Sequence, residues 1–296
     1  MQAFTNYRMW VRSMRENEII LKKELAPETY LIKVRAPLIA RKAKPGQFVI
    51  VRASEDCERI PLTLIDWDPI EGTITLVFKV VGASTLELGK LNTGDVLHDL
   101  VGPLGKPAEI KFYGKACVIG RGVAIAAAYE RAKHLKEAGN DVTAIISART
   151  SSLLIYKDEF RRVSDRLFIV TDDGSEGTRG YAADLLKNLL SSGERFDVVY
   201  AVGAATLMRT VSEVTKPFKI KTIVSLNSLM IDGTGMCGCC RVTIGGKPMF
   251  ACVDGPEFDA HLVDFEEFRA RIHMYDEEEK LALKFMGEGM HVKAGD

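Results

Sequence analysis

The sequence has no excess of either charge and no long hydrophobic run. Its 296 residues include 40 Lys and Arg against 40 Asp and Glu, so the formal net charge is zero, and no segment concentrates basic residues. A chain without a basic patch is not expected to bind nucleic acid or an anionic membrane surface. No apolar stretch approaches the roughly 20 residues that a membrane-spanning helix needs. Nucleic-acid binding and membrane insertion are therefore not expected.

The sequence also lacks the marks of a secreted or histidine-ligated metal protein. Residues 1–17 are polar and contain arginine, without the apolar core of a signal peptide. Clustered thiols without such a signal suggest a reducing compartment, so we expect the protein in the cytoplasm. No spacing typical of metal ligands occurs among the five histidines, at positions 98, 134, 261, 273 and 291.

Four of the six cysteines lie within sixteen residues near the C-terminus. Cys237 and Cys240 are separated by two residues, and Cys252 returns after a strand-like run and a Gly-Gly turn. Glycines at 233, 235 and 238 allow a tight loop around a small anionic object. Iron–sulfur clusters have four ligands, and the plant-type spacing is C-x4-C-x2-C…C. Counting back from Cys237 places Asp232 at the first ligand position.

The sequence therefore predicts a 2Fe–2S cluster with the ligands Asp232, Cys237, Cys240 and Cys252. Zinc also accepts three thiolates and a carboxylate, so a structural zinc site in a non-catalytic scaffold is an alternative. We expect no ligand role for Cys239.

Residues 17–112 have the pattern of a small antiparallel β-barrel. Short β-branched or aromatic runs lie at residues 18–21, 29–34, 47–51 and 73–80, and Pro-Gly, Glu-Gly and Gly-Asp turns separate them. Three stretches there suit a ligand. Arg59-Ile-Pro61-Leu62-Thr63 offers a guanidinium, a proline-stiffened strand and a hydroxyl within five residues. Gly82-Ala-Ser84-Thr85 places a glycine and two hydroxyls at an expected helix start, which suits phosphate. Gly102-Pro-Leu-Gly105 is expected to form a rigid loop.

Residues 113–225 alternate strand and helix patterns. Strands are expected near 116–120, 141–146, 166–171 and 196–202, and helices at 123–139, 181–190 and 206–214. This alternation predicts a parallel, doubly wound sheet with a ligand crevice at the carboxyl ends of its strands. Glycine turns that can hold a dinucleotide follow three of the strands. They contain Gly120 and Gly122, then Asp173 with Gly174, and then Gly203.

Together these motifs resemble the ferredoxin–NADP reductase superfamily. Within it the chain is similar to electron-transfer subunits of dihydroorotate dehydrogenase. It is more similar still to the small-subunit family of NADH-dependent reduced ferredoxin:NADP oxidoreductases, also named sulfide dehydrogenase subunits. The resemblance covers roughly residues 17–275, and its most specific marks are Pro45-Gly-Gln-Phe48, Glu58-Arg-Ile-Pro-Leu-Thr63 and the block from Asp232 to Pro256. It implies an FAD-binding β-barrel (17–112), an α/β nicotinamide-dinucleotide domain (113–225), a 2Fe–2S segment (226–275) and a C-terminal helix and tail (276–296).

The resemblance also implies roles for residues at matching positions. Arg59 would pair with the FAD pyrophosphate, and Pro61, Leu62 and Thr63 would line the flavin ring. Phosphates would be held by Gly82, Ser84 and Thr85, with Gly102 nearby, and a nicotinamide dinucleotide by Gly120, Gly122, Asp173 and Gly203.

The implied function is electron transfer. NAD(H) would exchange a hydride with FAD, and single electrons would pass through the cluster to a larger flavin and iron–sulfur subunit in a heterodimer that serves ferredoxin. A dihydroorotate dehydrogenase electron-transfer subunit is the alternative, but its four ligands would be cysteines, whereas this chain has Asp232.

We expect NAD(H) rather than NADP(H) as the nicotinamide cofactor. Arg149 suits the extra phosphate of NADP(H), whereas the resemblance favours NAD(H). Arg121, Ala124 and Ala204 replace residues that are common at this site and could narrow it.

Overall fold

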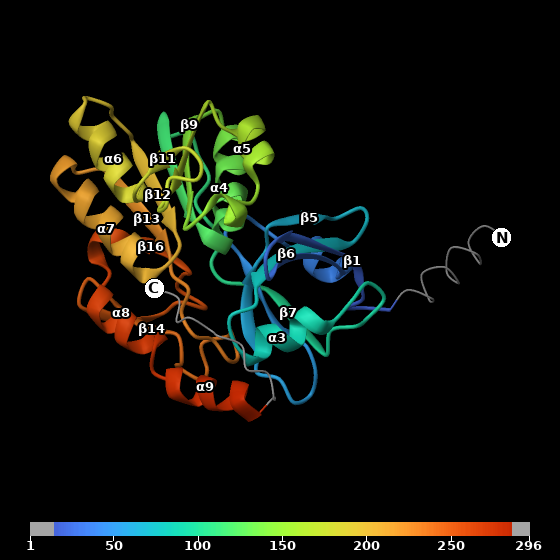
Figure 1. The fold of residues 1–296 in the computed structure, drawn as a ribbon. Coiled ribbons are helices and arrows are strands. Elements are labelled where there is room, and N and C mark those ends of the chain that lie inside the picture. Colours follow the sequence, from blue (N-terminus) through green and yellow to red (C-terminus); the bar gives the residue numbers. More distant parts are fainter. Residues whose placement is uncertain (1–14, 286–296) are drawn as a thin grey trace.

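The computed structural model describes residues 15–285. Figure 1 shows three regions: a β-barrel on the right, an α/β domain at the upper left and the C-terminal segment below them. The expectation that the chain has no signal peptide concerns residues 1–17, and the first fourteen of these lie outside the described residues. The tail after residue 285 also lies outside them. No helix within residues 15–285 is long and apolar enough to cross a membrane.

The barrel consists of two antiparallel sheets around an apolar interior. The first has the order β1-β2-β6-β5, formed by Ile19–Ala26, Thr29–Arg35, Thr73–Lys79 and Asp66–Asp68. The second has the order β4-β3-β7, formed by Ile60–Thr63, Phe48–Arg52 and Asp99–Leu104. Two short helices, α2 (Pro37–Ala40) and α3 (Ala83–Lys90), complete it. Alternating side chains such as Ile32, Val34 and Val49 fill the interior.

The α/β domain has one seven-stranded sheet, in the order β11-β10-β9-β8-β12-β13-β16. All of its neighbours pair in parallel except β16, which runs antiparallel to β13. The strands are Thr178–Arg179, Arg166–Thr171, Asp141–Ala148, Lys115–Arg121, Val198–Val202, Lys221–Ser225 and Glu257–Asp259. Strand order reverses between β8 and β12, so the ligand crevice of such a sheet is expected at their carboxyl ends.

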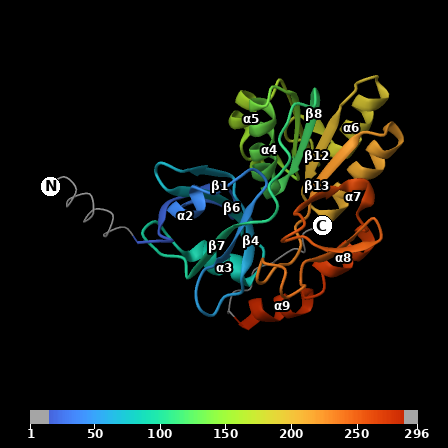
Figure 2. The same ribbon diagram turned by 180° about the vertical axis from the view of Figure 1, so that it is seen from behind.

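Helices cover both faces of this sheet, as Figure 1 shows and Figure 2 confirms from behind. One face carries α4 (Ile125–Glu137) and α5 (Lys157–Val163), and the other carries α6 (Ala182–Ser191) and α7 (Ala205–Thr215). Short 3₁₀ turns occur at Gly122–Ala124, Ser151–Leu153, Lys216–Phe218 and Ala260–Leu262.

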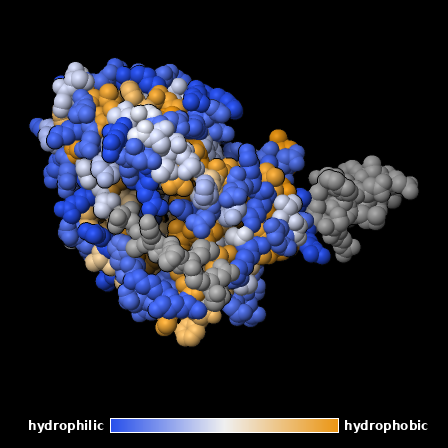
Figure 3. Space-filling view, viewed as in Figure 1, coloured by the Kyte–Doolittle hydropathy of each residue, from blue (hydrophilic) through white to orange (hydrophobic). Residues whose placement is uncertain are grey.

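The C-terminal segment is a hairpin with two helices. Strands β14 (Arg241–Ile244) and β15 (Lys247–Phe250) form the hairpin, followed by β16 and by α8 (Phe265–Ile272) and α9 (Asp276–Phe285). Strand β16 belongs to the sheet of the α/β domain, so the segment is built into that domain. The face of the molecule seen in Figure 3 is mostly hydrophilic, with hydrophobic residues interspersed.

Most of the expected elements are present, with instructive differences. The expected rigid loop at Gly102-Pro103-Leu104 is wrong in part, because these residues lie in β7 and pair with β3. The sequence analysis gave no strand at β13 and no helices at α5 and α8. These elements are short, and their stability comes from packing on the sheet or the hairpin rather than from a long periodic pattern.

A buried ionic group joins the three regions. Arg131 and Glu130 of α4 are 3% and 1% exposed. Arg131 forms an ion pair with Glu257 of β16, and the Gly46 amide of the barrel donates to Glu130 Oε1 over 3.3 Å. His134 Nδ1 lies 3.2 Å from the same Glu130 oxygen. Because buried charges are stable only when paired, this group holds the barrel, α4 and the C-terminal segment in one arrangement.

Candidate functional site

The first half of the expected cluster site is the pair Asp232 and Cys237. The Cys237 thiol donates to Asp232 Oδ1 over 2.9 Å; Cys237 is exposed and Asp232 is half-buried. Asp232 Oδ2 accepts hydrogen bonds from the Thr234 hydroxyl at 2.7 Å and from the Met236 amide at 2.9 Å. These bonds, that of Cys237 first, hold the pKa of Asp232 well below its usual range. The carboxylate is therefore ionised and faces a thiol.

The second half is the pair Cys240 and Cys252, which are 2% and 1% exposed. The Cys252 amide donates to Cys240 Sγ over 3.4 Å. Burial, together with the neighbouring Cys240, raises the pKa of the Cys252 thiol to about 12. The structure thus brings the four predicted ligands together as two pairs rather than around one point. Within residues 15–285, no three His, Cys, Asp or Glu side chains gather closely enough to hold a single metal ion.

Glycines give the loop its path and set it against the barrel. Gly233, Gly235 and Gly238 have φ values of +75°, +85° and +70°, which other residues rarely adopt. A Cβ at Gly233 would lie 2.7 Å from Leu104 of β7 and 2.9 Å from Ile50 of β3. The loop that carries Asp232 therefore rests directly on the three-stranded sheet of the barrel.

The expected flavin-ring residues lie on β4. This edge strand pairs with β3, with Phe48 opposite Thr63 and Ile50 opposite Pro61. Pro61, Leu62 and Thr63 are all half-buried. Strand β3 thus carries β4 on one side and, through Ile50, contacts the cluster loop. Arg59 precedes β4, and its Nη2 donates to Asp99 Oδ2 over 2.9 Å, so an internal carboxylate holds its guanidinium.

The expected phosphate-binding residues lie at the start of α3. Gly82 is the N-cap, and Ser84 and Thr85 belong to the first turn. Thr85 Oγ1 accepts hydrogen bonds from the Val81 amide at 2.9 Å and from the Gly82 amide at 3.0 Å, so this hydroxyl caps the helix.

An internal anion occupies the same place. Glu279 of α9 accepts a hydrogen bond from the Ala83 amide over 2.6 Å, and a Cβ at Gly82 would lie 2.1 Å from the same Oε1. The N-terminus of α3 thus accepts a carboxylate of the same chain, through the kind of amide contact that a phosphate would also make. Nothing in the sequence pointed to Glu279, because it lies 196 positions from Ala83.

The predicted glycines of the α/β domain fall at the reversal of strand order. Gly120 ends β8 beneath α4, where a Cβ would lie 2.6 Å from Ala128. Gly122 follows with φ +60° and open space around it, and Gly203 follows β12, the neighbour of β8. Gly120 therefore allows close helix packing, and Gly122 is open at the crevice where such folds bind dinucleotides. Gly203 is buried, and a Cβ there would lie 2.9 Å from Leu207.

Arg121 forms an ion pair that the sequence analysis missed. Its Nη1 and Nη2 donate to Asp172 Oδ1 and Oδ2 over 2.9 and 2.7 Å, across the ends of β8 and β10. The hydrogen bonds to Asp172 raise the pKa of Arg121, so its charge is fixed. The predicted residue Asp173 instead accepts hydrogen bonds from the amide and the hydroxyl of Ser175, which shape the loop after β10.

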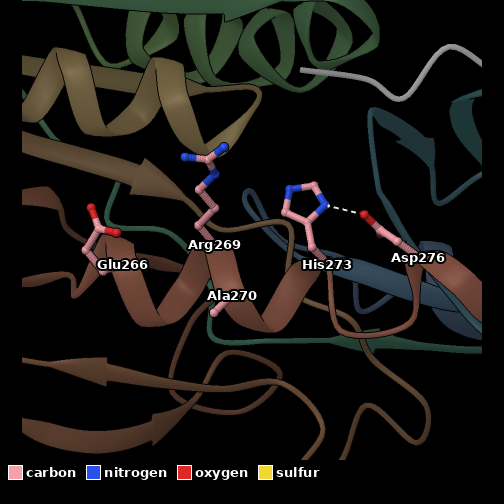
Figure 4. Close-up of a pocket in the computed structure, with 5 residues that line it drawn as sticks. All are labelled: Glu266, Arg269, Ala270, His273 and Asp276. Atoms are coloured by element: carbon pink, nitrogen blue, oxygen red, sulfur yellow. Dashed lines mark hydrogen bonds and ion pairs between the residues drawn. The ribbon is translucent and has the colours of Figure 1, made fainter.

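A surface hollow of about 500 Å³ lies elsewhere, on α8 and the start of α9 (Figure 4). It contains none of the predicted site residues, and it is lined by Glu266, Arg269, Ala270, His273 and Asp276.

Known proteins are similar in sequence to this chain over most of its length. Residues 227–264 match the iron–sulfur cluster binding domain of dihydroorotate dehydrogenase B. A dihydroorotate dehydrogenase B (NAD(+)) electron transfer subunit homolog from Thermotoga maritima is 46% identical over 276 residues, covering 92% of this chain and 97% of that protein. The corresponding subunit from Enterococcus faecalis is 31% identical over 252 residues, covering 82% and 95%.

A solved structure matches as well. It is a chain of an NADH-dependent reduced ferredoxin–NADP oxidoreductase studied for flavin-based electron bifurcation. The identity is 43% and the TM-score 0.88, with 93% of this chain and 99% of that chain covered. The expected ferredoxin–NADP reductase-like fold is confirmed.

The expected FAD, 2Fe–2S cluster and nicotinamide dinucleotide are likewise confirmed as the cofactors. The zinc scaffold is set aside, because the matched segment is an iron–sulfur domain. The chain is an iron–sulfur flavoprotein that transfers electrons, and it belongs to the family of dihydroorotate dehydrogenase B electron-transfer subunits and their homologues.

Proposed function

We propose that Asp232, Cys237, Cys240 and Cys252 hold the 2Fe–2S cluster as two pairs, one pair for each iron. The observation that supports this most is the arrangement of the loop: one carboxylate–thiol pair at the surface and one thiol–thiol pair in the core. A dinuclear cluster has two metal ions with two protein ligands each, so two pairs suit it. The 2.9 Å contact between Cys237 Sγ and Asp232 Oδ1 holds a proton that a cation can replace.

We place FAD on the barrel beside this loop. Pro61, Leu62 and Thr63 would line the flavin ring, Arg59 would turn from Asp99 to the pyrophosphate, and Gly102 of β7 would border the site. A forked guanidinium suits phosphate oxygens better than an ammonium does. At the start of α3, Gly82, Ser84 and Thr85 would hold the phosphates, at the place where Glu279 now accepts a hydrogen bond from the Ala83 amide.

The dinucleotide would bind at the carboxyl ends of β8 and β12. Gly122 leaves room for its phosphates, Gly203 lets the turn after β12 pack against Leu207, Gly120 seats α4 beneath the site, and Asp173 shapes the third loop. We propose NAD(H) rather than NADP(H), because the related solved protein is described as NADH-dependent. Arg149 could still read a ribose phosphate, so the two cofactors have to be compared directly.

Flavin accepts a hydride and returns electrons singly, which makes it the converter between nicotinamide and an iron–sulfur centre. The residues of this chain position the groups. Strand β3 links the flavin strand β4 to the cluster loop through Ile50, so both sites rest on one rigid sheet. The fixed Asp232–Cys237 pair lies at the surface, where electrons can leave the chain.

We further propose that the physiological form is a heterodimer in the cytoplasm. A larger flavin and iron–sulfur subunit would take the electrons, and ferredoxin would be served through that complex. Thiols that hold a cluster favour a reducing compartment.

A second candidate is a dihydroorotate dehydrogenase electron-transfer subunit, which the descriptions of several relatives favour. Asp232 weighs against it, because four cysteines are expected there.

The test is anaerobic titration of the purified full chain with NADH and, separately, with NADPH. Flavin bleaching and the EPR signal of the reduced cluster are followed together. We expect faster bleaching with NADH and then cluster reduction. Faster reduction by NADPH contradicts the NAD(H) assignment, and bleaching without cluster reduction contradicts the electron path. Purification of the native complex tests the partner, and reduction of that complex by dihydroorotate would favour the second candidate.

A further inference from the structure

Helix α8 packs against the hairpin that lies between the two buried cysteines, Cys240 and Cys252. Its Phe268 is 1% exposed and belongs to the same core cluster as Cys240 and Cys252. Glu267 and Arg271 are one helical turn apart and therefore lie on one side of α8. Both are half-buried, whereas Arg269 and Ala270 between them are exposed. Two charged residues thus sit on a part of α8 that is shielded from solvent.

Arg271 contacts the cluster loop itself. Its Nη2 donates to the carbonyl oxygen of Cys239 over 3.0 Å. That carbonyl belongs to the peptide bond that leads into Cys240, so the guanidinium lies one peptide group from a proposed iron ligand. Arg271 Nε is also buried, with no hydrogen-bond partner among residues 15–285. The positive charge is therefore only partly neutralised.

Glu267 lies near Arg241, the neighbour of Cys240 on its C-terminal side. Its Oε1 lies 4.0 Å from Nε of Arg241, the residue that follows Cys240. Glu267 Oε2 is buried and has no hydrogen-bond partner in the described part of the chain. Helix α8 therefore places a cation against the carbonyl of residue 239 and an anion beside Arg241, whose guanidinium offsets part of that negative charge.

Charges in such a position act on electron affinity. Reducing a cluster adds one negative charge, so a nearby cation stabilises the reduced form and a nearby anion destabilises it. The effect is large where burial keeps water and salt from screening it. A hydrogen bond to the loop carbonyl also fixes the orientation of the peptide that carries Cys240.

We propose that Arg271 sets the reduction potential of the cluster by holding its charge against the Cys239 carbonyl, and that Glu267 acts in the opposite direction. Both are positioning residues, because neither is a ligand. This inference rests on the proposed ligand set and deepens it, since it names the residues outside the four ligands that tune the centre.

The test is an EPR-monitored redox titration of the cluster in the full chain. Arg271→Gln removes the charge and should shift the midpoint potential to a more negative value. Arg271→Lys keeps the charge and should retain most of the wild-type potential. Arg269→Gln is the matched control, because it removes the same charge from the same helix at an exposed position that points into the hollow of Figure 4. Its potential should stay near that of the wild type.

Glu267→Gln removes a negative charge and should therefore shift the midpoint potential of the cluster to a more positive value. If the Arg271→Gln protein does not retain its cluster, the pair Glu267→Gln and Arg271→Lys decides. Equal shifts in Arg271→Gln and Arg269→Gln, or a Glu267→Gln shift in the negative direction, would overturn the inference. Retention of the cluster after replacement of its ligands would instead refute the proposed ligand set, so the two failures are distinguishable.

Discussion

The cluster loop and the N-terminus of α3 are both prepared for an anionic group, but in different ways. The cluster loop organises itself: Asp232 and Cys237 are five residues apart, and their contact depends on glycines between and beside them. The start of α3 instead relies on Glu279, which reaches it from a distant helix. The cluster loop is therefore formed by contacts between residues close in sequence. The start of α3 is occupied by the Glu279 carboxylate, which a phosphate bound there as we propose would displace.

This difference separates what binding changes in each region. Loading the cluster as we propose removes the thiol protons of a loop in which the contact between Asp232 and Cys237 is already formed. Binding FAD as we propose requires Arg59 to leave Asp99 and Glu279 to leave the Ala83 amide. We therefore expect substitutions in the cluster loop to act through loss of ligands, and substitutions near α3 to act through competition.

The largest effect is expected at the cluster loop. Asp232→Ala should lose the cluster or leave it unstable, because alanine removes the carboxylate that lies 2.9 Å from Cys237 Sγ and that we propose as a ligand. Asp232→Cys should keep the cluster and shift its potential, since a thiolate is a softer donor than a carboxylate. Iron content and the EPR spectrum measure both outcomes. Cys239→Ser is the control and should retain a normal cluster; an unchanged EPR signal in Asp232→Ala would refute the carboxylate ligand.

The next effect is loss of flavin from the barrel. Arg59→Ala should weaken FAD binding by roughly 1.5–3 kcal/mol, the contribution of a hydrogen bond to a charged group, which corresponds to about ten- to hundredfold in Kd. Fluorescence titration of the flavin-depleted chain measures it, with exposed Arg41→Ala as the control. Mass analysis of released flavin should give FAD. Release of FMN, or equal affinity in the two variants, would contradict the assignment.

A smaller effect of opposite sign sharpens the comparison at α3. Glu279→Gln should strengthen FAD binding by about two- to fivefold, because one negative charge leaves the helix N-terminus that the phosphates need. The same fluorescence titration applies, and Glu278→Gln on α9 is the matched control because that residue is also exposed. Weaker FAD binding in Glu279→Gln would show that the carboxylate supports the site instead of competing for it.

The smallest effect concerns His134 in the buried ionic group that joins the barrel, α4 and the C-terminal segment. Burial opposes the charged form of His134, but Glu130 outweighs it through a hydrogen bond and its charge, so the pKa of His134 is raised above 6.5. A raised pKa in the folded state stabilises the protein fully below about pH 6.5, and this stabilisation is lost as the pH rises through the folded value.

His134→Gln should therefore reduce the free energy of unfolding at pH 6 by less than about 1 kcal/mol, because partial exposure screens the pair. The difference from wild type should shrink at pH 8. Chemical denaturation at both pH values measures it, with exposed His98→Gln as the control. A difference that grows with pH would contradict the assigned protonation.

The same contrast explains what the sequence could predict. Four of the barrel strands and the parallel sheet follow from local periodicity and are present in the structure. Local spacing also indicates the four cluster residues, whose role as ligands is a proposal. Glu279, the Arg121–Asp172 pair and the junction through Arg131 depend on contacts between distant segments, which no single stretch reveals. Strand β13 and helix α8 are short and become stable only through packing. The structure also separates the glycine turns, since Gly120 packs under a helix and Gly122 is open.

The central claim is that a carboxylate and three thiolates hold the cluster as two unequal pairs. Mössbauer spectroscopy of the oxidised, ⁵⁷Fe-loaded full chain tests it most directly, because isomer shift and quadrupole splitting report the ligands of each iron. We predict two doublets of equal area, one from an iron with an oxygen ligand and one from an iron with sulfur ligands alone, which become alike in Asp232→Cys. Two equivalent all-sulfur irons in the wild-type chain would contradict the claim.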